Sequence, residues 1–210
     1  VRMIRAIRFK VKLGATIDPK ISKSISNQAY LLANIPAARL YDECIKLFHN
    51  ENAYEVFEQL IKYGLLNYLF PQTEETSFIY KTLLNTSNRI KIGKPVTPAF
   101  LFAVFLWSAQ NKRFNKLNKK KKSRILTMTQ ASEDVISEQT KKVLMPRWLS
   151  DRVKDIWLMQ YQLENYGLKK AQELIGHPRF RMAYDFLVLR SESINPELTE
   201  RAKYWTQLQQ

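Results

Sequence analysis

The apolar residues of this chain recur at helical spacing, and this feature constrains the fold more than any other. Along most of its 210 residues, large apolar side chains stand three or four positions apart, and Gly or Pro interrupts the pattern at short intervals. Strand-like alternation never continues beyond four residues. The five glycines are also few for an architecture of strands and tight turns. The sequence therefore predicts an all-α fold.

The interruptions divide the chain into a series of expected helices. The range 99–109 is apolar on all sides, which indicates a buried helix. Asp18 followed by Pro19 is a typical helix start, and Gly14 and Gly64 are typical helix ends. We expect helices over residues 2–13, 19–32, 37–48, 52–63, 78–88, 99–109, 132–144, 148–166, 168–175, 179–190 and 197–209.

The charge of the chain indicates a polyanionic partner. Lys and Arg number 34 against 19 Asp and Glu, so the formal net charge is +15. Such a surplus repels itself in a compact protein, and a bound polyanion relieves that repulsion. Nucleic acid is the first candidate and an anionic membrane surface the second, while the third alternative is a basic protein with a solvated surface.

The chain has few residues that bind metals or form disulfides. Cys44 is its only cysteine, and its two histidines, His49 and His177, are far apart in the sequence. A disulfide framework needs at least two cysteines, and a zinc site needs several ligands at short spacing. We therefore expect no disulfide, no metal site and no catalytic residue here, and a reducing compartment fits this composition.

The first helix carries a stripe of cations. Arg2, Arg5, Arg8 and Lys12 follow one another at spacings of three, three and four, beside the apolar stripe that begins at Met3. Like charges at this spacing destabilise an isolated helix slightly, so something anionic opposite them would favour the arrangement. The spacing alone leaves open whether the stripe binds a ligand or is only solvated. Since Val1 has neither a Met nor a capping residue before it, we expect the chain to begin inside an element of a longer protein.

Residues 2–9, Arg-Met-Ile-Arg-Ala-Ile-Arg-Phe, resemble the neck helix of the class II nucleotidyltransferases. These enzymes are the bacterial poly(A) polymerases and the CCA-adding tRNA enzymes. The resemblance implies that Arg2, Arg5 and Arg8 face the base of the incoming nucleotide, together with an acidic pair that would precede Val1. Residues 36–43 resemble the next neck motif, in which Arg39 and Glu43 would form a pair that supports the neck helices.

The C-terminal half favours one branch of this family. Residues 98–103, 152–157 and 177–190 resemble the body and tail of bacterial poly(A) polymerases, whereas CCA-adding enzymes are similar mainly through the neck. A polar stretch at 72–77 and a break at Pro146 suggest the boundaries. We therefore expect a neck at residues 1–72, a body at 73–145 and a tail at 146–210.

The resemblance also implies a function and a missing part. Poly(A) polymerases add AMP from ATP to RNA 3′ ends, using Mg²⁺ held in a β-sheet head by an Asp-x-Asp pair near a Gly-Ser turn. This chain contains neither sequence. We expect it to be inactive alone and to bind no cofactor by itself. The expected partners are ATP and RNA 3′ ends, with no membrane, in a cytoplasmic monomer. The alternatives are a CCA-adding enzyme and a non-enzymatic helical RNA-binding module.

A second cationic segment is expected to contact RNA. Residues 112–124 contain eight cations and no acidic residue, and such a segment suits phosphates of any sequence. A solvated loop is the alternative. The candidate residues are Lys112, Arg113, Lys116, Lys119, Lys120, Lys121, Lys122 and Arg124.

Overall fold

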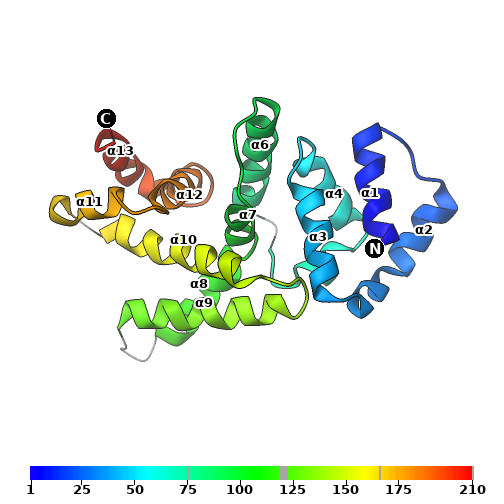
Figure 1. Cartoon of the computed structure of the whole chain (residues 1–210), viewed down its shortest axis with the longest axis horizontal. Coiled ribbons are helices and arrows are strands. Elements are labelled where there is room, and N and C mark those ends of the chain that lie inside the picture. The colour runs from blue at the N-terminus through cyan, green and yellow to red at the C-terminus, as the bar shows by residue number, and fades with distance from the viewer. Residues whose placement is uncertain (75, 119–122, 166, 210) are drawn as a thin grey trace. The chain divides into compact units, whose positions relative to one another are not determined.

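The computed structural model describes residues 1–74, 76–118, 123–165 and 167–209, and every regular element in these ranges is a helix (Figure 1). This confirms the prediction of an all-α fold. The elements are α1 (Arg2–Leu13), α2 (Pro19–Asn27), η1 (Ala29–Asn34), α3 (Ala37–Phe48), α4 (Ala53–Lys62), α5 (Leu66–Leu69), α6 (Ser77–Lys91), α7 (Pro98–Phe105), α8 (Trp107–Asn118), α9 (Arg124–Thr140), α10 (Arg147–Asn165), α11 (Leu168–Ile175), α12 (Phe180–Ser193), η2 (Pro196–Leu198) and α13 (Thr199–Gln207).

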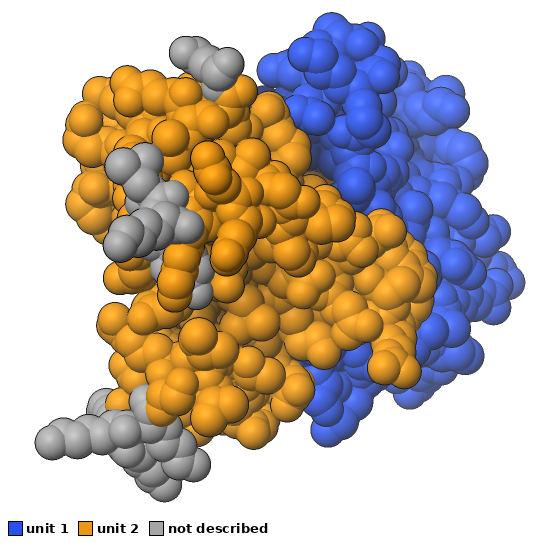
Figure 2. Space-filling model, turned by 60° about the vertical axis from the view of Figure 1, so that its left-hand side comes forward, with its two compact units in different colours: residues 1–73, 83–98, 136–145 blue, residues 74–82, 99–135, 146–210 orange. Residues whose placement is uncertain are grey.

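The helices form two compact units, which Figure 2 shows in different colours. Unit 1 consists of residues 1–73, 83–98 and 136–145, and unit 2 consists of residues 74–82, 99–135 and 146–210. Two boundaries between the units fall inside α6 and α9. The division into neck, body and tail concerns roles in a longer enzyme and stays a prediction.

Two expected capping residues stand at the end of α1 and at the start of α2. Gly14 ends α1 with φ 60°, a left-handed conformation that costs glycine little. The side chain of Asp18 accepts hydrogen bonds from the backbone N–H groups of Lys20 and Ile21, at 2.8 and 3.3 Å, and so caps α2. These contacts confirm the boundaries that the sequence indicated.

Three of the expected helices differ from the structure in ways that change the topology or a helix start. The second helix ends at Asn27 rather than at residue 32, and a 3₁₀ helix follows it. The apolar range 99–109 is divided between α7 and α8, which meet at Leu106. Helix α9 begins at Arg124 rather than at Ser132. In its first turns the hydroxyl of Thr127 donates to the Ser123 carbonyl at 3.0 Å, and this bond satisfies a side chain that usually disfavours helix.

Unit 1 has a core of aliphatic and aromatic side chains around α3 and α4. Phe48 of α3 packs against Phe57 of α4, with ring centroids 6.5 Å apart, and against Phe70 at 6.2 Å. Gln139 of α9 donates to the Leu69 carbonyl at 2.7 Å, which ties this part of α9 to α5. Helix α1 packs against both α3 and α4, so this core fixes its orientation.

Unit 2 has an aromatic core centred on α12. The ring of Phe186 contacts those of Phe78, Phe100 and Trp107 edge-on, at centroid distances of 5.0, 5.9 and 5.3 Å. Trp157 of α10 is completely buried, and its indole donates to the Ala103 carbonyl at 3.1 Å. The core therefore joins α6, α7, α8, α10 and α12.

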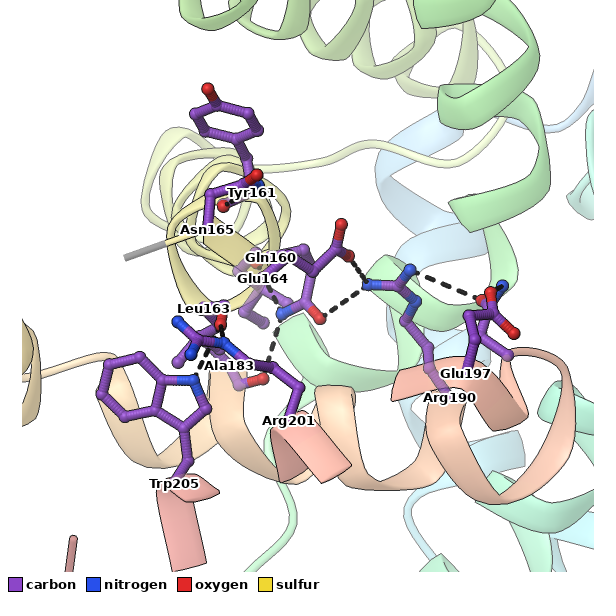
Figure 3. A network of polar contacts seen from close by, with 12 residues as sticks. Gln160, Tyr161, Leu163, Glu164, Asn165, Ala183, Arg190, Glu197, Arg201 and Trp205 are labelled. Atoms are coloured by element: carbon purple, nitrogen blue, oxygen red, sulfur yellow. Dashed lines mark hydrogen bonds and ion pairs between the residues drawn. The ribbon is translucent and has the colours of Figure 1, made fainter. Parts of the chain in front are cut away.

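A buried guanidinium stands beside this core (Figure 3). Arg190 of α12 donates to Glu164 at 2.7 Å and to Gln160 at 3.1 Å, both on α10. Its guanidinium also lies 4.5 Å from the ring centroid of Trp107. Burial lowers the pKa of Arg190, while the charge and hydrogen bond of Glu164 oppose that shift. These contacts bind α12 to α10 with a polar network that the sequence pattern did not reveal.

Cys44 lies on the buried face of α3, with 1% of its surface exposed. Burial raises the pKa of its thiol well above the ordinary value. The cysteine is therefore a core residue.

Candidate nucleotide and RNA interface

Helix α1 presents two different faces. Ile4 and Ile7 are fully buried and anchor the helix on the core of unit 1. Arg2 and Arg5 are exposed and Arg8 is half-buried, so the cation stripe runs beside the buried face. The apolar spacing thus fixes the rotation of α1 about its axis, and that rotation leaves Arg2 and Arg5 accessible at the edge of the packed face.

Arg5 is held by a carboxylate of α3. Its Nε and Nη2 atoms both donate to Oε1 of Glu43, at 3.0 and 2.7 Å, and Glu43 is only 2% exposed. Lys46 adds a longer contact at 3.7 Å. Burial acts to raise the pKa of the Glu43 carboxyl, but the hydrogen bond and charge of Arg5, together with Lys46 and Arg8, hold that pKa below its usual value. Glu43 therefore stays ionised inside the unit.

The expected pair of Arg39 with Glu43 is not the one that forms. Among the described residues, the ion-pair partners of Glu43 are Arg5 and Lys46. Arg39 is exposed on α3, one of the helices on which α1 packs. Arg2 and Arg5 lie at the start of α1, and Glu43 neutralises Arg5.

The i,i+4 spacing on α3 therefore did not predict the ion-pair partner of Glu43. Arg39 is its neighbour at i,i+4, but such exposed pairs contribute little. Arg5 lies 38 positions away in the sequence. It reaches α3 because the burial of Ile4 and Ile7 fixes the rotation of α1. The only signal in the sequence was the buried register of Glu43, which falls beside Leu40 and Leu47 on the apolar face of α3. A carboxylate in that register requires a cation from another helix.

The second cationic segment belongs to unit 2, and some of its charges are neutralised. Lys112 forms an ion pair with Glu74, which also accepts a hydrogen bond from Ser108 at 2.8 Å. Hydrogen bonds from Lys112 and Ser108 lower the pKa of Glu74. Arg113 contacts Asp134 at 2.9 Å. These acidic partners are distant in the sequence, so the composition of the segment alone overstated its free charge.

The other cations of this segment differ in their surroundings. Lys116 is exposed on α8, and Arg124 is exposed at the start of α9 with its guanidinium 5.7 Å from the ring centroid of Tyr161. Residues 112–118 are helical rather than a loop. The candidates Lys119, Lys120, Lys121 and Lys122 lie outside the described residues.

The two histidines each lie next to the end of a helix. Nδ1 of His177 accepts a hydrogen bond from the Arg179 backbone N–H at 3.1 Å, just before α12. Nε2 of His49, at the end of α3, lies 2.8 Å from the Val96 carbonyl. In the ranges that the structure describes, no three His, Cys, Asp or Glu side chains come together as metal ligands would. No described helix is long and apolar enough to cross a membrane.

Comparison with known families matches two parts of the chain. Residues 14–76, which include α2 to α5, match the family described as "Probable RNA and SrmB- binding site of polymerase A". Residues 120–210 match the family described as "Polymerase A arginine-rich C-terminus". The two matches together include most of unit 1 and of unit 2.

Comparison with whole proteins gives a consistent result. Poly(A) polymerase I of Salmonella typhimurium is 36% identical over 221 residues, with all of this chain and 48% of the relative aligned. Poly(A) polymerase I of Haemophilus influenzae is 32% identical, with 100% of this chain and 49% of the relative aligned. A CCA-adding enzyme of Geobacillus sp. is 38% identical over 69 residues, which are 33% of this chain and 17% of that enzyme.

Both kinds of comparison point to the same proteins. The CCA-adding enzyme matches only a third of the chain, whereas the poly(A) polymerases match all of it. The chain spans about half the length of these curated relatives. It belongs to the family of bacterial poly(A) polymerases.

Proposed function

We propose that this chain is the nucleotide-recognition and RNA-binding part of a poly(A) polymerase that adds AMP from ATP to RNA 3′ ends. The observation that carries the proposal is the group of arginines at the start of α1. The buried Glu43 holds Arg5 there by two hydrogen bonds, and Arg2 remains exposed beside it. Guanidinium groups fixed on a packed helix are suited to the acceptor atoms of a base and to phosphate oxygens.

The three arginines would have different roles in this proposal. Arg2 would contact the base of the bound ATP directly, because its side chain is exposed. Arg5 would present its remaining N–H groups in a fixed direction, since Glu43 engages two of its nitrogens. Arg8 is half-buried one turn further along, and its guanidinium lies 5.0 Å from the ring centroid of Phe9. Glu43 is a positioning residue, and Arg39 adds positive charge nearby.

The reaction itself would depend on residues outside this chain. Nucleotidyl transfer would use Mg²⁺ as a Lewis acid, and oxygen ligands from carboxylates would hold such an ion. We propose that the carboxylates that hold this ion belong to another part of the longer protein. We assign ATP recognition to α1 and assign no chemical step to this chain.

RNA would be held mainly through its phosphates. The net charge of +15 and the exposed Lys116 and Arg124 support this part of the proposal, as does the family description that matches residues 14–76. We further propose that the whole protein is a cytoplasmic monomer, and that its product marks RNA for decay.

The experiment that tests the function uses the whole protein with Mg²⁺, ATP or CTP, and two RNAs. One RNA is an unstructured oligomer and the other is a tRNA that lacks its CCA end. A poly(A) polymerase extends the oligomer with many AMP residues and prefers ATP to CTP. Addition of two CMP residues and one AMP, restricted to the tRNA, would identify a CCA-adding enzyme instead. Binding of both RNAs without any incorporation would support a non-enzymatic module.

A further inference from the structure

Trp148 has an unusual position for a tryptophan. It lies in the first turn of α10 with 45% of its surface exposed, whereas Trp107, Trp157 and Trp205 are 4%, 0% and 0% exposed. Its neighbours Leu149 and Val153 are fully buried and supply the contact of this turn with the core. Large aromatic side chains are usually buried, so the packing of unit 2 does not account for Trp148.

One cationic side chain lies over the exposed ring, and a second is its neighbour in the sequence. The guanidinium of Arg152, one helical turn further on, lies 5.2 Å from the ring centroid of Trp148. Arg147 is adjacent and its side chain is 96% exposed. In the described part of the chain, Arg152 forms no ion pair with a carboxylate. Asp151 contacts Arg147 at 3.8 Å and Lys154 at 3.1 Å, so two cations share this one carboxylate.

We propose that Trp148 is a stacking platform for a base of single-stranded RNA, with Arg147 and Arg152 on the flanking phosphates. This inference rests on the RNA binding proposed above and names a base contact on the C-terminal helices. A nucleotide combines a flat aromatic face with a negative charge, and this surface offers the complement of both. Every base has a π-face, so such a platform accepts any sequence. An acidic peptide would satisfy the arginines but would leave the indole ring exposed.

The test uses the 210-residue chain and the intrinsic fluorescence of Trp148. Because the other three tryptophans are buried, a neutral quencher such as acrylamide should act mainly on Trp148. Saturating oligo(A) should change the emission of Trp148 and protect it from acrylamide. The variant Trp148→Phe removes the signal and retains an aromatic ring, and so identifies its source.

Binding measurements separate the base from the phosphates. Affinity for oligo(A) should fall about fivefold to a hundredfold in Trp148→Leu, since the loss of one base–aromatic stacking contact weakens binding by about that factor. Affinity for an oligomer with the same phosphates but abasic sites should not change, nor should the salt dependence. Trp148→Phe should retain most of the affinity. The matched control is Leu126→Ala, because Leu126 is 67% exposed on α9 and apolar.

Three results would contradict the proposal. One is an equal loss of affinity for oligo(A) and for the abasic oligomer in Trp148→Leu. Another is unchanged binding of oligo(A) by that variant, with its melting temperature also unchanged. The third is conversion of a dimer into monomers by the substitution, which would make Trp148 a contact between copies of the chain. If the unmodified chain binds no RNA, the proposed function fails before this inference is reached.

Discussion

Arg5 donates two hydrogen bonds to one oxygen of Glu43, from Nε at 3.0 Å and from Nη2 at 2.7 Å, although 38 positions separate the two residues. One partner has an exposed side chain and the other is buried, with side-chain exposures of 47% and 2%. The ion pair therefore links an exposed side chain of α1 to a buried carboxylate of α3.

The two partners should respond differently to substitution. Arg5→Met leaves the buried carboxylate with only the distant Lys46, and an unsatisfied buried acceptor costs about 1–3 kcal/mol. Glu43→Gln removes the buried charge and leaves an arginine that water can solvate, so it should reduce the free energy of unfolding less. Urea unfolding of both variants measures the difference. Equal losses would contradict the asymmetry, and Lys12→Met on the same helix is the control.

The same pair should make stability depend on pH. The pKa of Glu43 is lower in the folded chain than its ordinary value of 4.5, so its contribution is complete above that value. The contribution is lost as the pH falls through the folded pKa. We expect the free energy of unfolding to decline more steeply below about pH 4.5 in the unmodified chain than in Glu43→Gln. Parallel pH profiles for the two proteins would show that Glu43 does not titrate in this way.

Nucleotide selection should depend on Arg2. In the whole protein, Arg2→Ala should lower kcat/KM for ATP by about ten- to a hundredfold, because it removes a charge-assisted hydrogen bond of about 1.5–3 kcal/mol. Preference for ATP over CTP should weaken, while the melting temperature should change little because Arg2 is exposed. Steady-state incorporation of ATP and CTP measures this. Lys12→Ala, at the far end of the stripe, should leave the preference intact, and unchanged selection in both variants would make Arg2 a solvated residue.

The lysines at 119–122 should bind RNA without sequence preference. Replacing all four with Ala should weaken the binding of unrelated RNAs by similar factors and reduce the slope of log affinity against log salt by about 0.7 for each phosphate that the variant no longer neutralises. Lys112 and Arg113 are paired with Glu74 and Asp134, so their replacement should affect RNA less and the melting temperature more. Filter binding over a range of salt concentrations compares the two variants. An unchanged slope for the first variant would mean that the lysines do not contact phosphates.

The buried network around Arg190 should be essential for the stability of unit 2. Arg190→Met leaves Glu164 and Gln160 without their shared donor and removes the contact with Trp107. We expect a loss of about 1–3 kcal/mol in the free energy of unfolding. Arg181→Met is the matched control, because Arg181 is on the same helix and exposed in an i,i+4 pair with Asp185. Thermal unfolding should show a much smaller change for the control.

How far the sequence predicts the fold is clear from particular elements. Helix α3 occupies the expected residues because an apolar register and proline at its start agree with each other. The sequence predicts that α9 begins at Ser132, but the helix begins at Arg124. Thr127 and Thr129 are weak helix formers, and in the structure their hydroxyls donate to carbonyls one turn earlier. The pattern of apolar residues does not show these hydrogen bonds.

The candidate site was predictable as a set of residues on one helix face, but its partners were not. The spacing of Arg2, Arg5 and Arg8 follows from the helical period. The choice of Arg5 over Arg39 by Glu43 depends instead on how α1 packs on α3. Counter-charges from distant segments, such as Glu74 for Lys112, likewise appear only when the chain is folded.

The burial of Cys44 has a practical consequence for labelling. Its thiol is both inaccessible and, because burial raises its pKa, almost entirely protonated near neutral pH. Maleimide reagents should therefore leave the native chain unmodified while it is folded. A cysteine introduced at Lys116 would then be the reactive thiol for a fluorophore or a spin label, with no need to remove the native residue from the core of unit 1.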